Sequence, residues 1–349
     1  MSRLVSLVYQ GKPDSLLWRR SLIPTTSLYL LNSCGDLIAE KSKEGRIQQV
    51  GANSFRTGSA NIVIRQDLPE VVAAALNDRN RRLIYVLDDN VGAHASDAGL
   101  PAKYRKRLEG RWQSTFLPLL RRADRIIVCS DYLSNHLSGF GKTVRADPVW
   151  HPDLVEGMES RLAVNAAPEY IRIGYLGTGS HSAELAFLIP VFLHLLRTRP
   201  DVELTLPAGT DWPAEMNGHP RVRMRWPIPW YQYEEQLLTE RFDICLYPCL
   251  NTPFAAGRSR NKLTEQALTG AFGLYSEVWP HAASVTASGA GRVVANTPEA
   301  WIDAVEAAIA GLPAWRDNAA EIAATLTALN DPAPQRAMWL DLLGLEDQG

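Results

Sequence analysis

The chain has 349 residues, of which 46% are hydrophobic and 21% charged, and its formal net charge is -2. This length suffices for two α/β domains of ordinary size, and the composition is that of a globular protein rather than a disordered or fibrous one. The N-terminus lacks a signal-peptide pattern, and no apolar run approaches the length of about 18 residues that a membrane span needs.

The four cysteines, Cys34, Cys129, Cys245 and Cys249, have no Cys or His partners at the spacing of a zinc site. Cys129 and Cys245 also fall inside expected buried strands. We therefore expect reduced thiols in the core of a cytosolic protein, with neither a disulfide framework nor a bound metal.

Charge is divided unevenly along the chain. Residues 1–150 hold 22 basic and 14 acidic residues, whereas residues 151–349 hold 14 basic and 24 acidic ones. Two units with different partners would produce this difference, and the basic half suits an anionic acceptor or membrane surface. Ordinary scatter of charge is the alternative. The basic half has no recognisable nucleic-acid-binding motif, so we expect no nucleic-acid partner.

Strand and helix patterns alternate in the first part of the chain. Residues 3–9 and Leu28–Leu31 are expected to be strands, and residues 41–60 to be loop with a short helix. Three elements follow: a strand at Asn61–Arg65, a helix at Pro69–Leu76 with proline near its first turn, and a strand at Leu83–Leu87.

The last of these strands ends in Asp88-Asp89-Asn90, at the sheet edge where α/β proteins place their chemistry. One Asp could serve as a general base, the pair could bind a divalent cation, or both could cap the next helix. His94, expected in the same loop, is a rival base because its pKa is near neutral, although a solvated loop histidine is the plainer interpretation.

Residues 103–122 are expected to form one long basic helix, kinked at Pro118. Its apolar residues recur at helical spacing. Such a helix can lie on an anionic membrane, or its apolar stripe can pack on the sheet while its charges are solvated.

A strand is expected at Asp124–Ser130, followed by a helix with Ser130 or Asp131 as N-cap. Proline and polar residues concentrate over residues 151–168, which we interpret as a linker. The second half opens with a strand at residues 171–176.

A glycine-rich turn, Gly177-Thr178-Gly179-Ser-His181, follows that strand and precedes a helix at about Ala183–Arg197. Such a turn lets the backbone approach a ligand and directs helix amides toward phosphate. The spacing is not the dinucleotide fingerprint, and a tight turn without a ligand is the alternative.

The remaining elements also alternate. They comprise strands at Val202–Leu206, Val222–Met224, Asp243–Tyr247, Ala271–Tyr275 and Val293–Val294, and helices at Tyr231–Thr239, Leu263–Gly270, Pro298–Ala310, 313–329 and 332–345.

The segment from Phe254 to Glu277 joins a strand to a basic loop, a helix and another strand. Arg258 and Lys262 are four residues apart, so we expect both on one face of the helix start. Together with the hydroxyl of Ser259 and free helix amides, they would suit a diphosphate, while Glu265 could accept hydrogen bonds from sugar or ribose hydroxyls. A surface helix with a solvated basic start is the alternative.

The pattern Arg258-Ser259-x-x-Lys262-x-x-Glu265, followed by Ala, Gly and a short strand, resembles the donor-site segment of GT-B glycosyltransferases of the family 1/4 type. The resemblance implies that Lys262 binds the donor diphosphate and that Glu265 binds the ribose of the nucleotide. Many members carry a second Glu eight positions earlier, where this chain has Gly257, so a contact from that position to the donor sugar is in doubt.

Two further stretches carry the same resemblance, which covers residues 80–312. Residues 123–133 look like the last strand and helix of a GT-B N-terminal domain. Residues 173–185 look like the glycine-rich loop over the donor, which implies that Gly177, Thr178, Gly179 and His181 lie near its sugar or phosphates.

We therefore expect two Rossmann-like α/β domains of the GT-B fold that face each other across a cleft. The N-terminal, acceptor-side domain would span residues 1–150, the linker 151–168, and the nucleotide-sugar domain 169–330. Residues 331–349 would form a terminal helix that packs back on the N-terminal domain.

The function implied is transfer of a sugar from a nucleotide-sugar to a hydroxyl of a glycan, a lipid-linked or a small-molecule acceptor, without metal or cofactor. Asp88, Asp89 or His94 would contact the acceptor. The alternatives are an inactive nucleotide-sugar-binding or scaffolding subunit of a polysaccharide assembly system, and a nucleotide-sugar epimerase. A cytoplasmic location is expected, with possible contact to the inner face of an anionic membrane.

Overall fold

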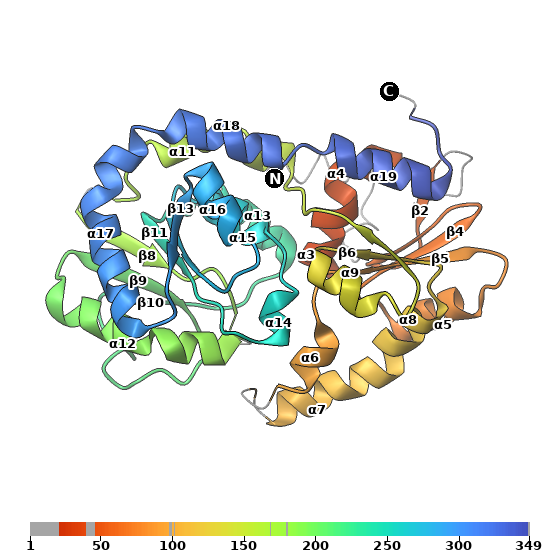
Figure 1. The fold of residues 1–349 in the computed structure, drawn as a ribbon, viewed down its shortest axis with the longest axis horizontal. Coiled ribbons are helices and arrows are strands. Elements are labelled where there is room, and N and C mark those ends of the chain that lie inside the picture. Colours follow the sequence, from red (N-terminus) through yellow and green to blue (C-terminus); the bar gives the residue numbers. More distant parts are fainter. Residues whose placement is uncertain are drawn as a thin grey trace.

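The computed structural model describes residues 21–39, 46–97, 100, 102–167, 169–178 and 181–347. Within these residues, seven strands form one sheet and six form another, and helices cover both (Figure 1). Each sheet has its own set of flanking helices, so the chain has the two-part α/β architecture that the alternating patterns predicted.

The first sheet runs in the order β1-β2-β3-β4-β5-β6-β7. Its strands are β1 (Ile38–Ala39), β2 (Ile47–Gln49), β3 (Ser54–Arg56), β4 (Ala60–Ile64), β5 (Arg82–Leu87), β6 (Arg125–Val128) and β7 (Lys142–Arg145). Strands β4 to β7 are parallel, whereas β3 is antiparallel to both of its neighbours. The apolar runs of β4 and β5 are buried on both faces, as is typical of central parallel strands.

Two predictions in the first part of the chain are wrong. Leu28–Leu31 is not a strand but lies in a π-helical turn, Ser27–Leu31, between the short helices α3 (Pro24–Thr26) and α4 (Asn32–Cys34). All five residues of that turn are buried, and a continuous apolar run does not distinguish a buried strand from a buried helix. Residues 47–56 contain β2 and β3 rather than loop and helix. The strand expected at residues 3–9 lies outside the described residues.

The second sheet is parallel throughout, in the order β10-β9-β8-β11-β12-β13. Its strands are β8 (Ile171–Gly174), β9 (Val202–Pro207), β10 (Val222–Arg225), β11 (Ile244–Tyr247), β12 (Phe272–Ser276) and β13 (Gly291–Val294). The strand order reverses between β8 and β11. In doubly wound sheets, the crevice at such a switch point, beyond the carboxyl ends of the strands, is where ligands bind.

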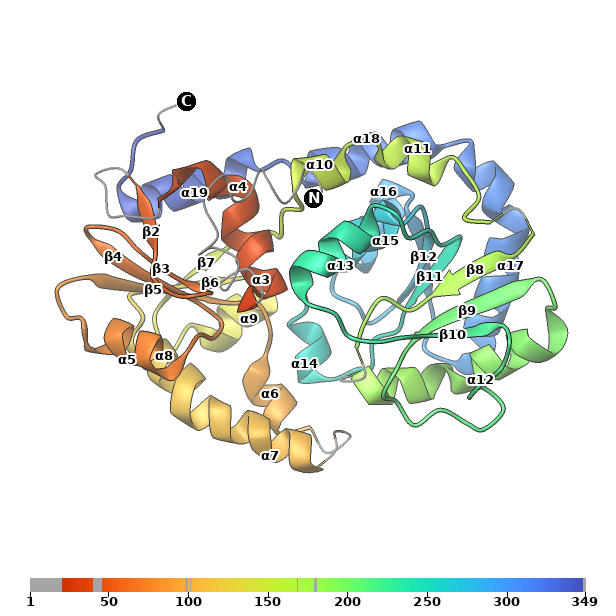
Figure 2. The ribbon, with the colours of Figure 1, turned by 180° about the vertical axis from the view of Figure 1, so that it is seen from behind.

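Helices lie on both sides of the sheets (Figures 1 and 2). In the first half they are α5 (Pro69–Asn77), α6 (Val91–Ala95), α7 (Ala102–Arg111), α8 (Leu117–Arg122) and α9 (Asp131–Leu137). The linker region holds α10 (Pro152–Val155) and α11 (Met158–Leu162). The second half has α12 (Ser182–Thr198), α13 (Trp230–Leu237), α14 (Pro253–Ala256), α15 (Asn261–Leu268), α16 (Ala282–Ser288), α17 (Pro298–Arg316) and α18 (Ala319–Leu329).

Local sequence signals explain several helix boundaries. Ser130 caps α9, because its hydroxyl accepts a hydrogen bond from the backbone N–H of Leu133, as expected for this residue type. Gly270, two residues beyond the end of α15, has a φ of 80°, a conformation that glycine adopts without strain. The basic helix is interrupted by a π-helical turn, Trp112–Phe116, just before Pro118, which has no N–H to donate.

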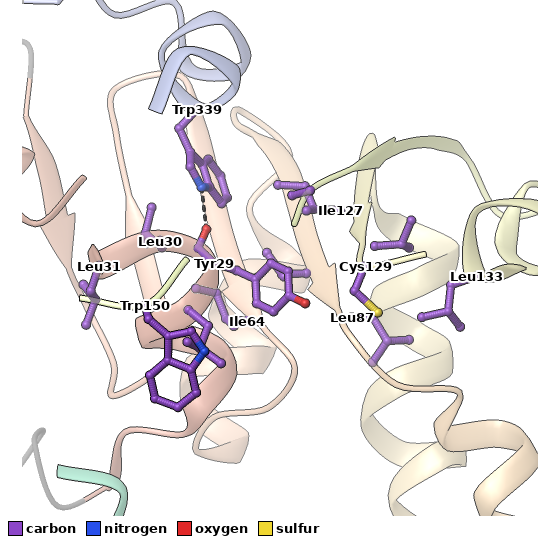
Figure 3. Packing of buried hydrophobic residues seen from close by; sticks show 14 of the residues in the cluster. Tyr29, Leu30, Leu31, Ile64, Leu87, Ile127, Cys129, Leu133, Trp150 and Trp339 are labelled. Atoms are coloured by element: carbon purple, nitrogen blue, oxygen red, sulfur yellow. Dashed lines mark hydrogen bonds between the residues drawn. The ribbon is translucent and has the colours of Figure 1, made fainter. Parts of the chain in front are cut away.

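The terminal helix α19 (Ala333–Leu343) crosses from the second half to the first and lies along α4 (Figure 1). The indole Nε1 of Trp339, which is fully buried, donates to the carbonyl oxygen of Tyr29 at 2.6 Å (Figure 3). Gln335 donates to the carbonyl of Leu28 at 3.0 Å. The helix therefore fastens the last residues of the chain to the buried π-helical turn of the first half.

Candidate functional site

A pocket of about 370 Å³ opens at the switch point of the second sheet. Its floor includes Lys262 and Glu265 of α15, and the turn after β8 contributes Gly177, Thr178 and His181. Apolar and aromatic residues complete its lining. They are Leu22, Ile23 and Pro24 of the first half and Leu176, Pro207, Trp226, Pro227, Ile228, Trp230 and Tyr233 of the second, and Arg225 also lines the pocket.

Lys262 and Glu265 form one ionic group on the floor of this pocket. Lys262 Nζ lies 2.5 Å from Glu265 Oε2 and donates to the carbonyl oxygen of Leu176 at 2.5 Å. The hydroxyl of Tyr233 donates to the other carboxylate oxygen, Oε1. Glu265 is only 4% exposed, so its orientation is set by Lys262 and Tyr233 on either side. A cation and an oriented carboxylate are thus presented together at the end of the crevice.

The turn after β8 brings the backbone close to this ionic group. A Cβ atom at Gly177 would overlap the ring of Tyr175, so the turn requires glycine there. The carbonyl of the preceding residue, Leu176, accepts the hydrogen bond from Lys262. Gly179 lies outside the described residues.

Arg258 does not lie where the sequence analysis expected it. The helix α15 begins at Asn261, so Arg258 belongs to the preceding loop and does not share a helical face with Lys262. Arg258 is 4% exposed, and its Nη2 lies 2.6 Å from Oε1 of Glu184, which belongs to α12. Burial alone would raise the pKa of Glu184, but Arg258 and His181 hold it below its ordinary value. Most of the charge of Arg258 is therefore neutralised inside the protein.

His181 is the third member of this buried cluster. Its Nδ1 lies 2.9 Å from Arg258 Nη2 and 3.0 Å from Glu184 Oε2. A guanidinium can only donate and a carboxylate can only accept, so Nδ1 accepts from Arg258 when it carries no proton and donates to Glu184 when it does. Either way, Arg258 and Glu184 fix the orientation of a histidine that lines the pocket.

The hydroxyl of Ser259 donates to Asn261 Oδ1 at 3.1 Å, a contact two residues along the chain. It does not line the pocket. The structure therefore brings Lys262, Glu265, Gly177, Thr178 and His181 together and leaves Ser259 at the side.

Gly257 lies at the boundary between the two halves. Its carbonyl oxygen accepts hydrogen bonds from Cys129 Sγ at 3.1 Å and Ser130 Oγ at 3.3 Å, both from the end of β6. A Cβ atom at this position would lie 3.3 Å from Asn90 Cβ. The space that the Glu side chain of related motifs would need is therefore occupied by residues of the first half of the chain.

The two carboxylates after β5 share one arginine. Arg65 Nη1 lies 2.7 Å from Asp89 Oδ2 and 3.3 Å from Asp88 Oδ1, and Thr25 Oγ1 donates to Asp88 Oδ2 at 2.9 Å. Arg65 adopts a left-handed φ of 54°, which is uncommon outside glycine. Burial raises the pKa of Asp88 to about 6, Asp89 adds to the rise and Arg65 opposes it.

The helix after this edge is capped by Asn90, whose Oδ1 accepts from the N–H of Ala93 at 3.1 Å. His94 belongs to that helix, α6, rather than to a loop, and it is only 8% exposed. Its ring stacks on Phe254 of α14 with centroids 3.9 Å apart. Burial lowers the pKa of His94, and Asp89 opposes this, while His181 and Arg258 in the second half add to the lowering.

The structure thus adds Glu184, Tyr233, Trp226 and Arg65 to the residues that the sequence indicated. Glu184 was detectable as an acid in the first turn of a helix after a glycine-rich turn, but the others carried no local signal. Among the described residues, no group of three or more His, Cys, Asp or Glu side chains is arranged to hold a metal ion. Within the same residues, no helix is long and apolar enough to cross a bilayer.

No protein-family model and no curated protein sequence matches this chain. Solved structures do match it. A sucrose-phosphate synthase from Thermosynechococcus elongatus has 17% identity and a TM-score of 0.53, over 78% of this chain and 70% of that one. An α,α-trehalose-phosphate synthase (UDP-forming) from Burkholderia vietnamiensis has 12% identity and a TM-score of 0.53, over 81% and 71%.

A third structure, trehalose-6-phosphate from E. coli bound with UDP-2-fluoro glucose, has 13% identity and a TM-score of 0.50, over 81% of this chain and 72% of that one. These structures are glycosyltransferases with two Rossmann-like domains. At such identities the similarity establishes the fold: this chain has the GT-B fold, as the sequence motifs predicted.

Proposed function

We propose that the protein is a glycosyltransferase that moves a sugar from a nucleotide-sugar donor to an acceptor hydroxyl. The observation that carries this proposal is the pairing of Lys262 and Glu265 on the floor of a pocket at the switch point of a doubly wound sheet. General similarity to glycosyltransferases of the same fold supports it.

The donor would lie across this pocket. Lys262 and the amides at the start of α15 would stabilise the negative charge that develops on the diphosphate as the bond to the sugar breaks. Glu265, held by Tyr233, would accept hydrogen bonds from the ribose hydroxyls. The indole of Trp226 is 72% exposed and lines the pocket, so it would offer a flat surface to the base.

The acceptor would enter from the first half. The side chains that face the second half there are the Asp88–Asp89 pair and His94. A carboxylate with a pKa of about 6 or a neutral imidazole can each take the acceptor proton near neutral pH. The new bond joins the sugar to the acceptor oxygen, and the nucleoside diphosphate leaves. We propose that no metal or other cofactor takes part.

Two related functions are alternatives. Gly257 lacks the carboxylate found in many members and is packed against the first half, which favours a subunit that binds a nucleotide-sugar without turnover. An epimerase would convert the donor without any acceptor. The four described cysteines are buried and unpaired, which is compatible with a cytoplasmic protein.

The decisive experiment is a thermal-shift panel of nucleotides and nucleotide-sugars on the wild type and Lys262→Ala. At about 100 times its dissociation constant, a ligand should stabilise the fold by about 2.7 kcal/mol. Lys142→Ala, an exposed lysine of β7, is the matched control. A shift with one nucleotide class that Lys262→Ala abolishes and Lys142→Ala retains is expected. No shift with any nucleotide would refute the donor site. If a nucleotide-sugar does bind, product analysis distinguishes transfer, epimerisation and binding without turnover.

A further inference from the structure

The helix α7 (Ala102–Arg111) has no buried residue. It holds five cations and one acid in ten residues. A helix inside a globular protein normally buries one apolar face, so most of the surface of α7 serves something other than the core of this chain.

Four of the cations form a stripe. Lys103, Arg107 and Arg111 follow each other at intervals of four, and Lys106 lies beside them, so their side chains share one face of the helix. All four are exposed. The opposite side of the helical segment carries Leu108 and Trp112, which pack against the core. The cationic stripe therefore faces away from the protein body.

No acid neutralises this stripe among the ion pairs of the described chain. Arg111 donates instead to the amide oxygen of Gln66 at 3.2 Å, and the guanidinium of Arg107 lies 5.1 Å from the ring centre of Tyr104. Four neighbouring like charges repel one another on a free surface. A negatively charged partner would remove that repulsion.

An exposed leucine lies close in the chain to the residue that Arg111 contacts. Leu68 is 57% exposed and is two residues from Gln66, the partner of Arg111. A polyanionic chain gains nothing from an exposed aliphatic side chain. A bilayer does, because headgroups contact the cations while the leucine reaches the acyl boundary.

We propose that the surface formed by Lys103, Lys106, Arg107, Arg111 and Leu68 docks on a bilayer with anionic headgroups. This docking is independent of the donor assignment.

The docking surface lies next to the acceptor side of the cleft. The helices α6 and α7 adjoin each other (Figures 1 and 2). Tyr104 of α7 meets His94 of α6 edge to face, with ring centroids 5.9 Å apart. Docking therefore places the acceptor side of the cleft one helix away from the lipid surface. If the proposed transfer is correct, its acceptor is carried on that surface, as a lipid-linked molecule would be.

The test is sedimentation of the full-length protein with vesicles of phosphatidylcholine, alone or with about one third phosphatidylglycerol. The stripe variant is Lys103→Gln, Lys106→Gln, Arg107→Gln and Arg111→Gln combined, since glutamine keeps the helix propensity. The matched control replaces four scattered exposed arginines by glutamine, namely Arg79, Arg197, Arg223 and Arg292.

The wild type and the control should sediment with anionic vesicles and not with neutral ones, and high salt should release them. The stripe variant should bind about 10²- to 10³-fold more weakly, since each cation near an anionic leaflet contributes about a five-fold gain. Leu68→Ser should lower the affinity for anionic vesicles about ten-fold. Equal losses in the control and the stripe variant, or wild-type binding to heparin without binding to vesicles, would overturn the proposal.

Discussion

Gly257 and Leu133 meet across the boundary between the two halves, where a Cβ atom on Gly257 would lie 3.2 Å from Leu133 Cδ2. On the same side, Ser130 donates to the carbonyl of Gly257 at 3.3 Å, and Asn90 Nδ2 donates to the carbonyl of Pro253 at 3.3 Å. The segment before Lys262 is thus held against the ends of β5 and β6. The closed arrangement of the cleft depends on a residue without a side chain at this position.

We therefore predict that Gly257→Glu separates the two halves. The larger side chain has to displace Leu133 and Asn90, at a cost of about 1 to 3 kcal/mol. Small-angle scattering should show a larger radius of gyration, and Gly257→Ala should change it much less. Unchanged scattering by Gly257→Glu would mean that the cleft accommodates a carboxylate here, as in the motif that the sequence resembles.

The ion pair between Arg258 and Glu184 provides a second prediction. Both side chains are at most 10% exposed, so Glu184→Gln leaves a buried guanidinium without its carboxylate. Urea unfolding should show a loss of about 3 to 5 kcal/mol.

Glu203→Gln is the control for this effect, because Glu203 pairs with Arg172 at 3.8 Å on the surface and should contribute less than about 1 kcal/mol. Arg258→Met combined with Glu184→Leu should recover most of the stability, since both charges are then absent. A double variant as unstable as Glu184→Gln would contradict the explanation.

The buried carboxyl of Asp88 should make stability depend on pH. Its pKa is raised to about 6 in the folded protein, whereas an unfolded Asp titrates near about 3.9. The folded state therefore holds this proton more tightly, and the contribution of Asp88 to the free energy of unfolding falls as pH rises from about 4 to 6. Relative to Asp88→Asn, the wild type should lose up to about 3 kcal/mol across that interval.

Urea titrations of both proteins at several pH values measure this difference. A difference that does not change with pH, or that increases with pH, would show that folding does not raise the pKa of Asp88. If Asp88 is also the general base, kcat/KM should rise through about pH 6 in the wild type, and His94→Gln should keep this limb.

The exposed indole of Trp226 should matter for ligand binding and not for folding. Trp226→Ala should change the free energy of unfolding by less than about 0.5 kcal/mol, because the side chain is 72% exposed. The affinity of the Trp226→Ala variant for the donor should fall about 5- to 100-fold, as expected when a base loses its stacking partner. Calorimetric titration measures this, with Tyr170→Ala, exposed outside the pocket, as control. Unchanged affinity would place the base elsewhere.

Elements with strong local patterns were predictable from the sequence. Apolar runs bounded by turns located β4, β5, β6 and β8, and the Ser130 cap marked the start of α9. The prediction failed at Leu28–Leu31, because a continuous apolar run is equally compatible with a buried helix and a buried strand. It also failed at β2 and β3, because these short strands depend on pairing with neighbours in the sheet. In the site, Lys262 and Glu265 were identifiable because the motif that contains them resembles the donor-site segment of GT-B glycosyltransferases.

The sequence alone determined the alternation of strands and helices, the two-part architecture and the position of the basic and acidic residues at strand ends, because these depend on periodicity and on caps within a few residues. Tertiary structure decided which charges remain available. Arg258 is neutralised by Glu184, 74 residues away, and Asp88 and Asp89 share the single charge of Arg65. Lys262 and Glu265 pair with each other and both line the pocket. Burial and ion pairing depend on distances that local sequence does not encode.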